Sequence, residues 1–162
     1  MITIQELMTS NPYSLRPSDT LEDARRLMTD HNIRHVPITD QDGELRGLIT
    51  QRGVLEVTHA ETKPSDLAVE LKELMIRDVS VIHPGSSVRQ AGLFLQRHKY
   101  GCLPVVDDKK LVGIITDSDF ITVAINLIEQ IEMTENDSEF VEENFDDLDD
   151  IDLPEVDLAE NV

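Results

Sequence analysis

The chain has 162 residues and a formal net charge of −19; 40% of its residues are hydrophobic, but only 4% are aromatic. This length suits one ordinary domain or two very small ones, and the core must consist mainly of aliphatic side chains. Because phosphate backbones and anionic lipids require basic surfaces, this charge balance argues against nucleic acid and membrane surfaces as partners.

The first residues, MITIQELMTS, lack the basic segment and apolar stretch of a signal peptide, so none is expected. No apolar run approaches the ~20 residues of a membrane-spanning helix. The only cysteine, Cys102, cannot form an internal disulfide. These features together predict a cytoplasmic protein.

The first predicted unit covers residues 1–58 and reads, in chain order, as β-α-β-β-α. An extended piece at 13–15 is followed by a helix over 20–31, with a serine cap and apolar residues on one face. Strands are predicted at 36–39 and 45–50, joined by an Asp- and Gly-containing turn that is typical of a hairpin. A closing helix begins directly after Thr50.

The same order recurs in a second unit, residues 73–131. Leu21 to His31 matches Val88 to His98 at an offset of 67 residues, and GLIT at 47–50 matches GIIT at 113–116 at an offset of 66. A long period seen twice indicates a tandem pair of small domains. The extended piece is predicted at 80–82, and the strands at 102–106 and 111–116. Residues 59–72 are a predicted linker, and 67–75 is expected to be helical.

The last segment, residues 132–162, differs in composition from the rest. Residues 1–130 hold 19 acidic and all 14 basic residues, whereas residues 131–162 hold the other 14 acidic residues and no basic one. A block of like charges predicts a disordered acidic tail. Its scattered apolar residues leave three roles open: a solubilising tail, a motif for a basic partner, or a segment that docks on this protein.

The tandem order, the HVPI and CLPVVD pieces and the ending GIITDSD together resemble a pair of CBS domains, the Bateman module. The resemblance covers about residues 2–130. It implies an α+β fold in which the two units pack sheet to sheet as one pseudo-twofold module, often as a homodimer. It also implies two clefts for adenosine-containing ligands such as AMP, ADP, ATP or S-adenosylmethionine, and a regulatory rather than catalytic role.

Thr116 and Asp119 are the central candidate residues. Thr116 is expected at the start of the closing helix, where backbone N–H groups without internal partners favour a phosphate. A carboxylate accepts hydrogen bonds only, so Asp119 suits the two ribose hydroxyls, and the resemblance implies the same two roles. The alternative is that Thr116 and Asp119 form a capping box that only stabilises the helix start.

The first unit has Thr50 at the equivalent cap but Gly53 where the second unit has Asp119. We therefore expect one competent cleft, at the second unit, and one weakened or empty cleft at the first. Two lost hydrogen bonds to a charged acceptor correspond to about 10- to 100-fold in affinity.

The resemblance also indicates residues that surround the ligand. Ser80, Ile82 and His83 are expected near the base, while Gly101, Cys102 and Pro104 supply backbone groups and an apolar wall. Arg34 and His35 are expected to reach phosphates, although a solvated surface position is the alternative for each basic side chain. The five histidines lack ligand spacing, so no metal site is expected. No catalytic set stands out, so the chain is not expected to be an enzyme.

The sequence thus favours a regulatory module that binds an adenosine-containing ligand, forms a homodimer and modulates an unidentified protein partner, with the acidic tail as the candidate segment for that contact. The competing interpretation is a ligand-free scaffold whose paired sheets serve dimerisation or interaction. Under that interpretation, loss of the Asp119 carboxylate alters stability only.

Overall fold

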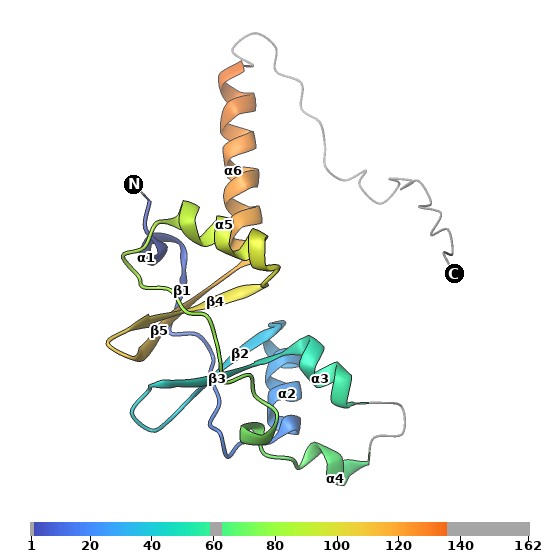
Figure 1. Cartoon of the computed structure of the whole chain (residues 1–162). Helices are drawn as coiled ribbons and strands as arrows, with labels where there is room; N and C mark the ends of the chain where they lie inside the picture. Colours follow the sequence, from blue (N-terminus) through green and yellow to red (C-terminus); the bar gives the residue numbers. More distant parts are fainter. Residues whose placement is uncertain (1, 59–62, 136–162) are drawn as a thin grey trace, which may run out of the picture. The chain divides into compact units, whose positions relative to one another are not determined.

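A computed structural model describes residues 2–58 and 63–135 of this chain (Figure 1). One compact unit extends through Ala124, and a second begins at Ile125. The predicted acidic tail lies outside the described residues from 136 onwards. Residues 132–135, which the sequence assigned to that tail, instead form the last turn of a helix.

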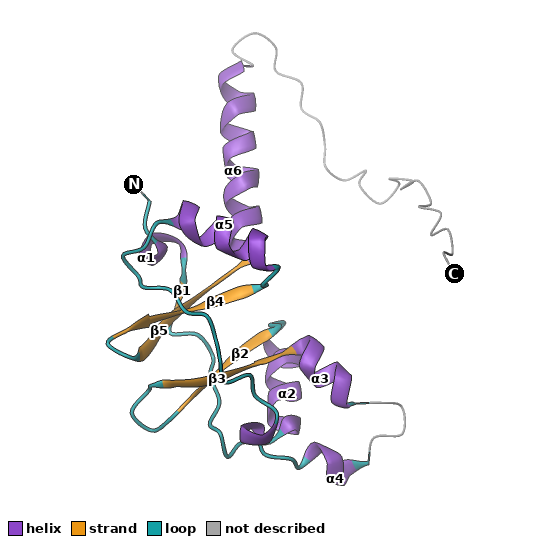
Figure 2. Ribbon diagram, viewed as in Figure 1, coloured by secondary structure: helices purple, strands orange, loops and turns teal. Residues whose placement is uncertain are grey.

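The first half of the compact unit contains four elements in the predicted order. They are α2 (Leu21–His31), β2 (His35–Thr39), β3 (Leu45–Thr50) and α3 (Gln51–Val57). The second half repeats them as α5 (Val88–His98), β4 (Cys102–Asp107), β5 (Lys110–Thr116) and α6 (Asp117–Glu135), as Figure 2 shows. The predicted α+β fold with two repeated units is therefore confirmed.

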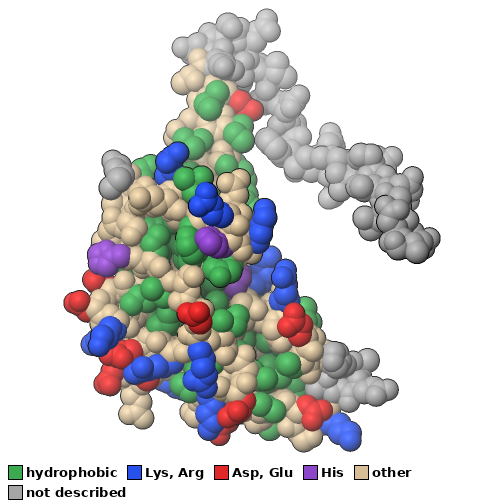
Figure 3. Space-filling view, viewed as in Figure 1, with side chains coloured by type: hydrophobic (Ala, Val, Ile, Leu, Met, Phe, Trp, Pro, Cys, Tyr) green, Lys and Arg blue, Asp and Glu red, His purple; other side chains and the backbone are tan. Residues whose placement is uncertain are grey.

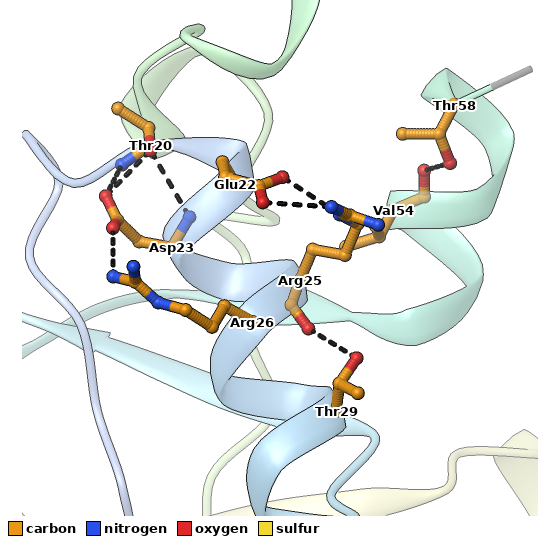
Figure 4. A network of polar contacts seen from close by, with 8 residues as sticks. All are labelled: Thr20, Glu22, Asp23, Arg25, Arg26, Thr29, Val54 and Thr58. Carbon is orange, nitrogen blue, oxygen red and sulfur yellow. Dashed lines mark hydrogen bonds and ion pairs between the residues drawn. The ribbon is translucent and has the colours of Figure 1, made fainter. Parts of the chain in front are cut away.

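Helix α2 begins at a threonine and not at the predicted serine. The Thr20 hydroxyl accepts a hydrogen bond from the Asp23 amide, and the Asp23 carboxylate accepts one from the Thr20 amide at 2.9 Å (Figure 4). This capping box satisfies two amides that the helix itself leaves unpaired. Leu21, Ala24 and Met28 then face the core from one side of the helix.

Each half has an antiparallel hairpin. Strands β2 and β3 pair from His35–Thr50 to Thr39–Leu45, and the turn between them uses Gly43 at φ +81°. The predicted extended pieces add one parallel bridge to each hairpin: Leu15 pairs with Ile38, and Ile82 pairs with Val105. Each half therefore resembles the expected three-stranded arrangement, although these pieces are too short to count as strands.

The segments that precede the two repeats are exchanged between the halves. Helix α1 (Ile4–Leu7) buries Ile4 in the core of the second half, and β1 (Thr9–Ser10) pairs antiparallel with β5. In return, Leu71 is fully buried in the core of the first half. The repeats seen in the sequence are thus not the units that pack together in space.

The predicted helix over 67–75 is wrong. Only α4 (Pro64–Leu67) and a 3-10 turn, η1 (Leu71–Glu73), form there. The backbone between them pairs with the start of α2, because the Leu21 amide donates to Val69 O and the Leu71 amide to Asp19 O. These backbone groups are therefore unavailable for a continuous helix.

Two glycines permit the exchanged segments to pass close to the sheets. A Cβ on Gly47 would lie 2.7 Å from Met75 Sδ and 2.8 Å from Ile76 O. At the equivalent Gly113, a Cβ would overlap Met8 Sδ and lie 3.1 Å from Thr9 O. The glycine shared by GLIT and GIIT therefore leaves room for the exchanged segment, a role that concerns packing and not ligand.

The two sheets meet in a small apolar cluster. Leu48 from β3 is buried with Cys102 and Ile114 from the other sheet, and Val79 packs against them. The hairpin turns also join, because the Leu45 amide donates to Lys109 O and the Leu111 amide to Gly43 O. The predicted sheet-to-sheet packing of the two units is confirmed.

Candidate functional site

A cavity of about 780 Å³ lies between the two halves. Pockets of about 300–1,000 Å³ are typical of small-molecule sites. From the first half it is lined by Arg34 and His35 at the start of β2, by the end of β3 and by α3 along its length. From the second half it is lined by residues 78–80, by 99–102 and by the first residue of α6.

Backbone pairing of the same kind supports each wall of the cavity. The Gln51 amide donates to Arg34 O at 2.8 Å, and the Asp117 amide donates to Gly101 O at 3.1 Å. Each of these bonds joins the first residue of a closing helix to the residue just before the first strand of the hairpin. The side chains differ, since only Arg34 and Asp117 are charged, and they form an ion pair across the cavity at 3.5 Å.

His35 and Cys102 form the less polar part of the cavity. His35 packs so closely on Gly101 that a Cβ there would lie 2.8 Å from His35 Nε2. Burial, reinforced by the Arg34 charge, lowers the pKa of His35 below its usual value, so the ring is neutral near pH 7. Burial also raises the pKa of the Cys102 thiol to about 12, and this cysteine is therefore an inert apolar surface.

Thr50 lies at the start of α3, where its hydroxyl accepts a hydrogen bond from the Gly53 amide at 3.1 Å. A Cβ at Gly53 would lie 3.4 Å from Thr50 Oγ1, which is ordinary contact. Gly53 therefore brings no carboxylate to the cavity at the position equivalent to Asp119.

Thr116 and Asp119 do not line this cavity. Asp119 Oδ2 instead accepts a hydrogen bond from the Thr116 amide at 2.7 Å and from the Thr116 hydroxyl at 3.0 Å. This is the carboxylate half of a capping box. The local geometry is therefore the one that the sequence offered as the alternative to ribose binding, and the ligand role of the pair stays a prediction.

The cavity brings together six of the predicted site residues: Arg34, His35, Thr50, Ser80, Gly101 and Cys102. Pro104 is fully buried in β4, and the Ile82 amide donates to Pro104 O. His83 lies apart from the cavity, with Nε2 3.2 Å from Asp107 Oδ1 and Nδ1 accepting from the Gly85 amide. A role for Ile82, His83 or Pro104 at this cavity therefore has no support from their contacts.

Sequence reasoning missed several lining residues, including Arg52, Asp78, Lys99, Tyr100 and Asp117. Tyr100 is the most informative of them, because it belongs to a group of rings with Phe94 and His98. The matching residues of the first unit are Ile33, Leu27 and His31, so the ring group is a difference between the repeats. In a chain with only six aromatic residues, that difference was the available signal.

Other kinds of site find little support in the described part of the chain. No three His, Cys, Asp or Glu side chains within residues 2–58 and 63–135 gather as a metal ion would require. On the face seen in Figure 3, acidic and basic side chains are interspersed and do not form one basic patch. Among the described helices, none has the length and apolar character needed to cross a membrane.

Comparison with known proteins agrees with the repeat. A model of the CBS domain matches residues 4–60 and again residues 71–126. A crystal structure from Vibrio cholerae, of a protein assigned to acetoin utilization (AcuB), is 43% identical with a TM-score of 0.74; the match covers 82% of this chain and 97% of that one.

Two other similar structures contain adenosine compounds. CBSX2 in complex with AMP is 25% identical with a TM-score of 0.70, over 79% of this chain and 99% of that one. The CBS domain pair of MJ0100, in complex with 5′-methylthioadenosine and S-adenosyl-L-methionine, is 25% identical with a TM-score of 0.67, over 75% and 98%.

Some relatives are enzymes. Homoserine O-acetyltransferases from Methanocorpusculum labreanum and Methanosarcina acetivorans are 33% and 26% identical to this chain over 71% of its length. The chain spans only 23% and 20% of the lengths of these enzymes, and the match is confined to their CBS part. These matches therefore indicate no catalytic activity for the chain.

Proposed function

This chain belongs to the CBS domain family as a tandem pair, and we propose that it is a regulatory module that binds an adenosine-containing small molecule between its halves. The cavity of about 780 Å³ carries the proposal. It combines apolar walls with a few polar groups from both halves, as ligand sites commonly do. Because each half contributes one wall, an occupied cavity favours one packing of the halves over another.

The lining residues suggest how the ligand divides between the walls. We assign the base to the part of the cavity lined by Tyr100, Cys102 and Ser80, and an anionic group to the guanidinium groups of Arg34 and Arg52. Guanidinium groups bind phosphate by charge-assisted hydrogen bonds. AMP, ADP, ATP and S-adenosylmethionine are the candidate ligands.

The cleft predicted at Thr116 and Asp119 is a second proposed site. Both hydrogen bonds of the capping box go to Asp119 Oδ2, so Oδ1 is free of that pairing and can accept from ribose. Under the sequence prediction this cleft binds more tightly than the one at Gly53. Titration of variants that each disable one cleft shows which of the two clefts binds the ligand more tightly.

Isothermal titration calorimetry against the four candidate ligands tests the proposal. Ser80→Trp fills the cavity, whereas Asp119→Ala removes the predicted ribose acceptor and leaves the cavity lining unchanged. Loss of binding only in Ser80→Trp assigns the ligand to the cavity, and loss only in Asp119→Ala assigns it to the second cleft. If none of the four ligands binds the folded wild-type protein, the sensor function is wrong and the scaffold is favoured.

We also propose that the module is a cytoplasmic homodimer with a further protein partner. Exposed apolar side chains on the described helices support association, among them Leu55 on α3, Leu93 on α5 and Ile121 on α6. Sedimentation equilibrium with and without ligand measures the association. A sedimentation mass of one chain at micromolar concentration would rule out the dimer.

A further inference from the structure

The ion pair between Arg34 and Asp117 is unusual because the two residues come from different halves. Arg34 precedes β2, while Asp117 is the first residue of α6, and both line the cavity. The distance between Arg34 Nη2 and Asp117 Oδ1 is 3.5 Å. The pair therefore links the two halves at the proposed ligand site.

The repeat has no second copy of this ion pair. The residue equivalent to Arg34 is Gly101, and the residue equivalent to Asp117 is Gln51. The backbone bond is kept in both places, as Gln51 donates to Arg34 O and Asp117 to Gly101 O. All four residues line the same cavity, so the charged pair lies on one side of it and the equivalent pair, Gly101 and Gln51, carries no charge.

We propose that Asp117 competes with an anionic group of the ligand for the Arg34 guanidinium. The inference rests on the proposed function and deepens it by naming a residue that determines specificity. Both side chains are about half exposed, so the pair is weak and open to exchange. A phosphate brings a larger charge and more acceptor oxygens to the same guanidinium.

This competition has two consequences. First, the cavity discriminates by charge: a phosphorylated ligand must displace Asp117, whereas an uncharged nucleoside leaves the ion pair intact. Second, displacement releases a side chain at the point where β5 ends and α6 begins, since Asp117 directly follows Thr116. The first turn of α6 is therefore the segment that responds to an anionic ligand.

The test compares AMP with uncharged 5′-methylthioadenosine by calorimetry on the full chain. Asp117→Asn keeps the shape of the side chain but cannot hold the guanidinium as an ion pair. We expect this variant to bind AMP about 3- to 10-fold more tightly at low salt and 5′-methylthioadenosine within about twofold of wild type. Arg34→Gln is expected to weaken AMP binding and to reduce the effect of Asp117→Asn.

Asp107→Asn is the matched control. Asp107 pairs with His83 away from the cavity, and its side chain is 51% exposed, the same fraction as Asp117. The control removes the same charge and is expected to change AMP affinity by less than twofold.

Three results would overturn the inference while leaving the proposed function intact, provided that wild type binds AMP. These are equal effects of Asp117→Asn and Asp107→Asn, weaker AMP binding by Asp117→Asn, and an undiminished Asp117→Asn effect in the Arg34→Gln background. The last would mean that Asp117 acts through general repulsion alone. If no variant binds any candidate ligand, both the inference and the proposed function are wrong.

Discussion

Substitution of Gly47 tests whether the exchanged segment holds the halves together. In Gly47→Ala the new methyl group would lie 2.7 Å from Met75 Sδ and 2.8 Å from Ile76 O. The Met75 side chain can move, but Ile76 is held by two backbone hydrogen bonds to Leu48, each 2.9 Å long. The methyl group must therefore displace backbone that is already paired.

The magnitude follows from these contacts. Overpacking costs about 1–3 kcal/mol, and weakening of the two hydrogen bonds adds roughly 1 kcal/mol. Replacing a glycine in a strand by alanine raises the free energy of unfolding by about 0.5–1 kcal/mol, because alanine loses less conformational freedom on folding. We expect Gly47→Ala to lower the free energy of unfolding by about 1–3 kcal/mol.

Urea unfolding of the full chain, followed by far-UV circular dichroism, measures this change. Gly113→Ala is expected to lose less stability than Gly47→Ala. Met8 Sδ can move away, and Thr9 O lies 3.1 Å from the new methyl group. Gly53→Ala is the control, since its methyl group meets only ordinary contact inside α3, and it is expected to be neutral or stabilising by about 0.5–1 kcal/mol. Equal stabilities of Gly47→Ala and Gly53→Ala would refute the close-approach argument.

Two further predictions concern titratable groups in the cavity. Because the folded-state pKa of His35 is lowered, the unfolded chain binds the proton more readily, so stability should fall as the pH drops below about 6.5 and through the lowered folded pKa. His35→Gln should flatten that part of the pH–stability curve, and an unchanged slope would contradict the assignment. The Cys102 thiol, with a pKa of about 12, should react with a thiol reagent at pH 8 at least 100-fold more slowly in the folded protein than in urea. Rapid stoichiometric labelling of the folded protein would show that the Cys102 thiol is accessible to the reagent and would refute this prediction.

The candidate site was only partly predictable. Arg34 and His35 were identified from the resemblance to CBS pairs and Thr50 from the repeat, and the cavity does bring them together. Asp117 and Tyr100 were missed, because their interest depends on what faces them from the other half. Arg34 and Asp117 are 83 positions apart in the sequence, and no local pattern relates them.

The sequence by itself determined the local elements of this protein. Apolar spacing at 21–31 and 88–98 specified the helices, and the turns at Asp40–Gly43 and Asp107–Lys109 specified the hairpins. The reason is that helix and strand periodicity are expressed over a few neighbouring residues.

Only the tertiary structure decided which half each short segment joins. Ile4, from the first predicted unit, is buried in the second core, and Met75, from the second predicted unit, is buried in the first core. The spacing of apolar residues in such a short segment is compatible with packing on either sheet. Burial against the sheet of the other half determines where the segment lies. The same packing brings Arg34 to Asp117 and leaves the cavity between Thr50 and Tyr100.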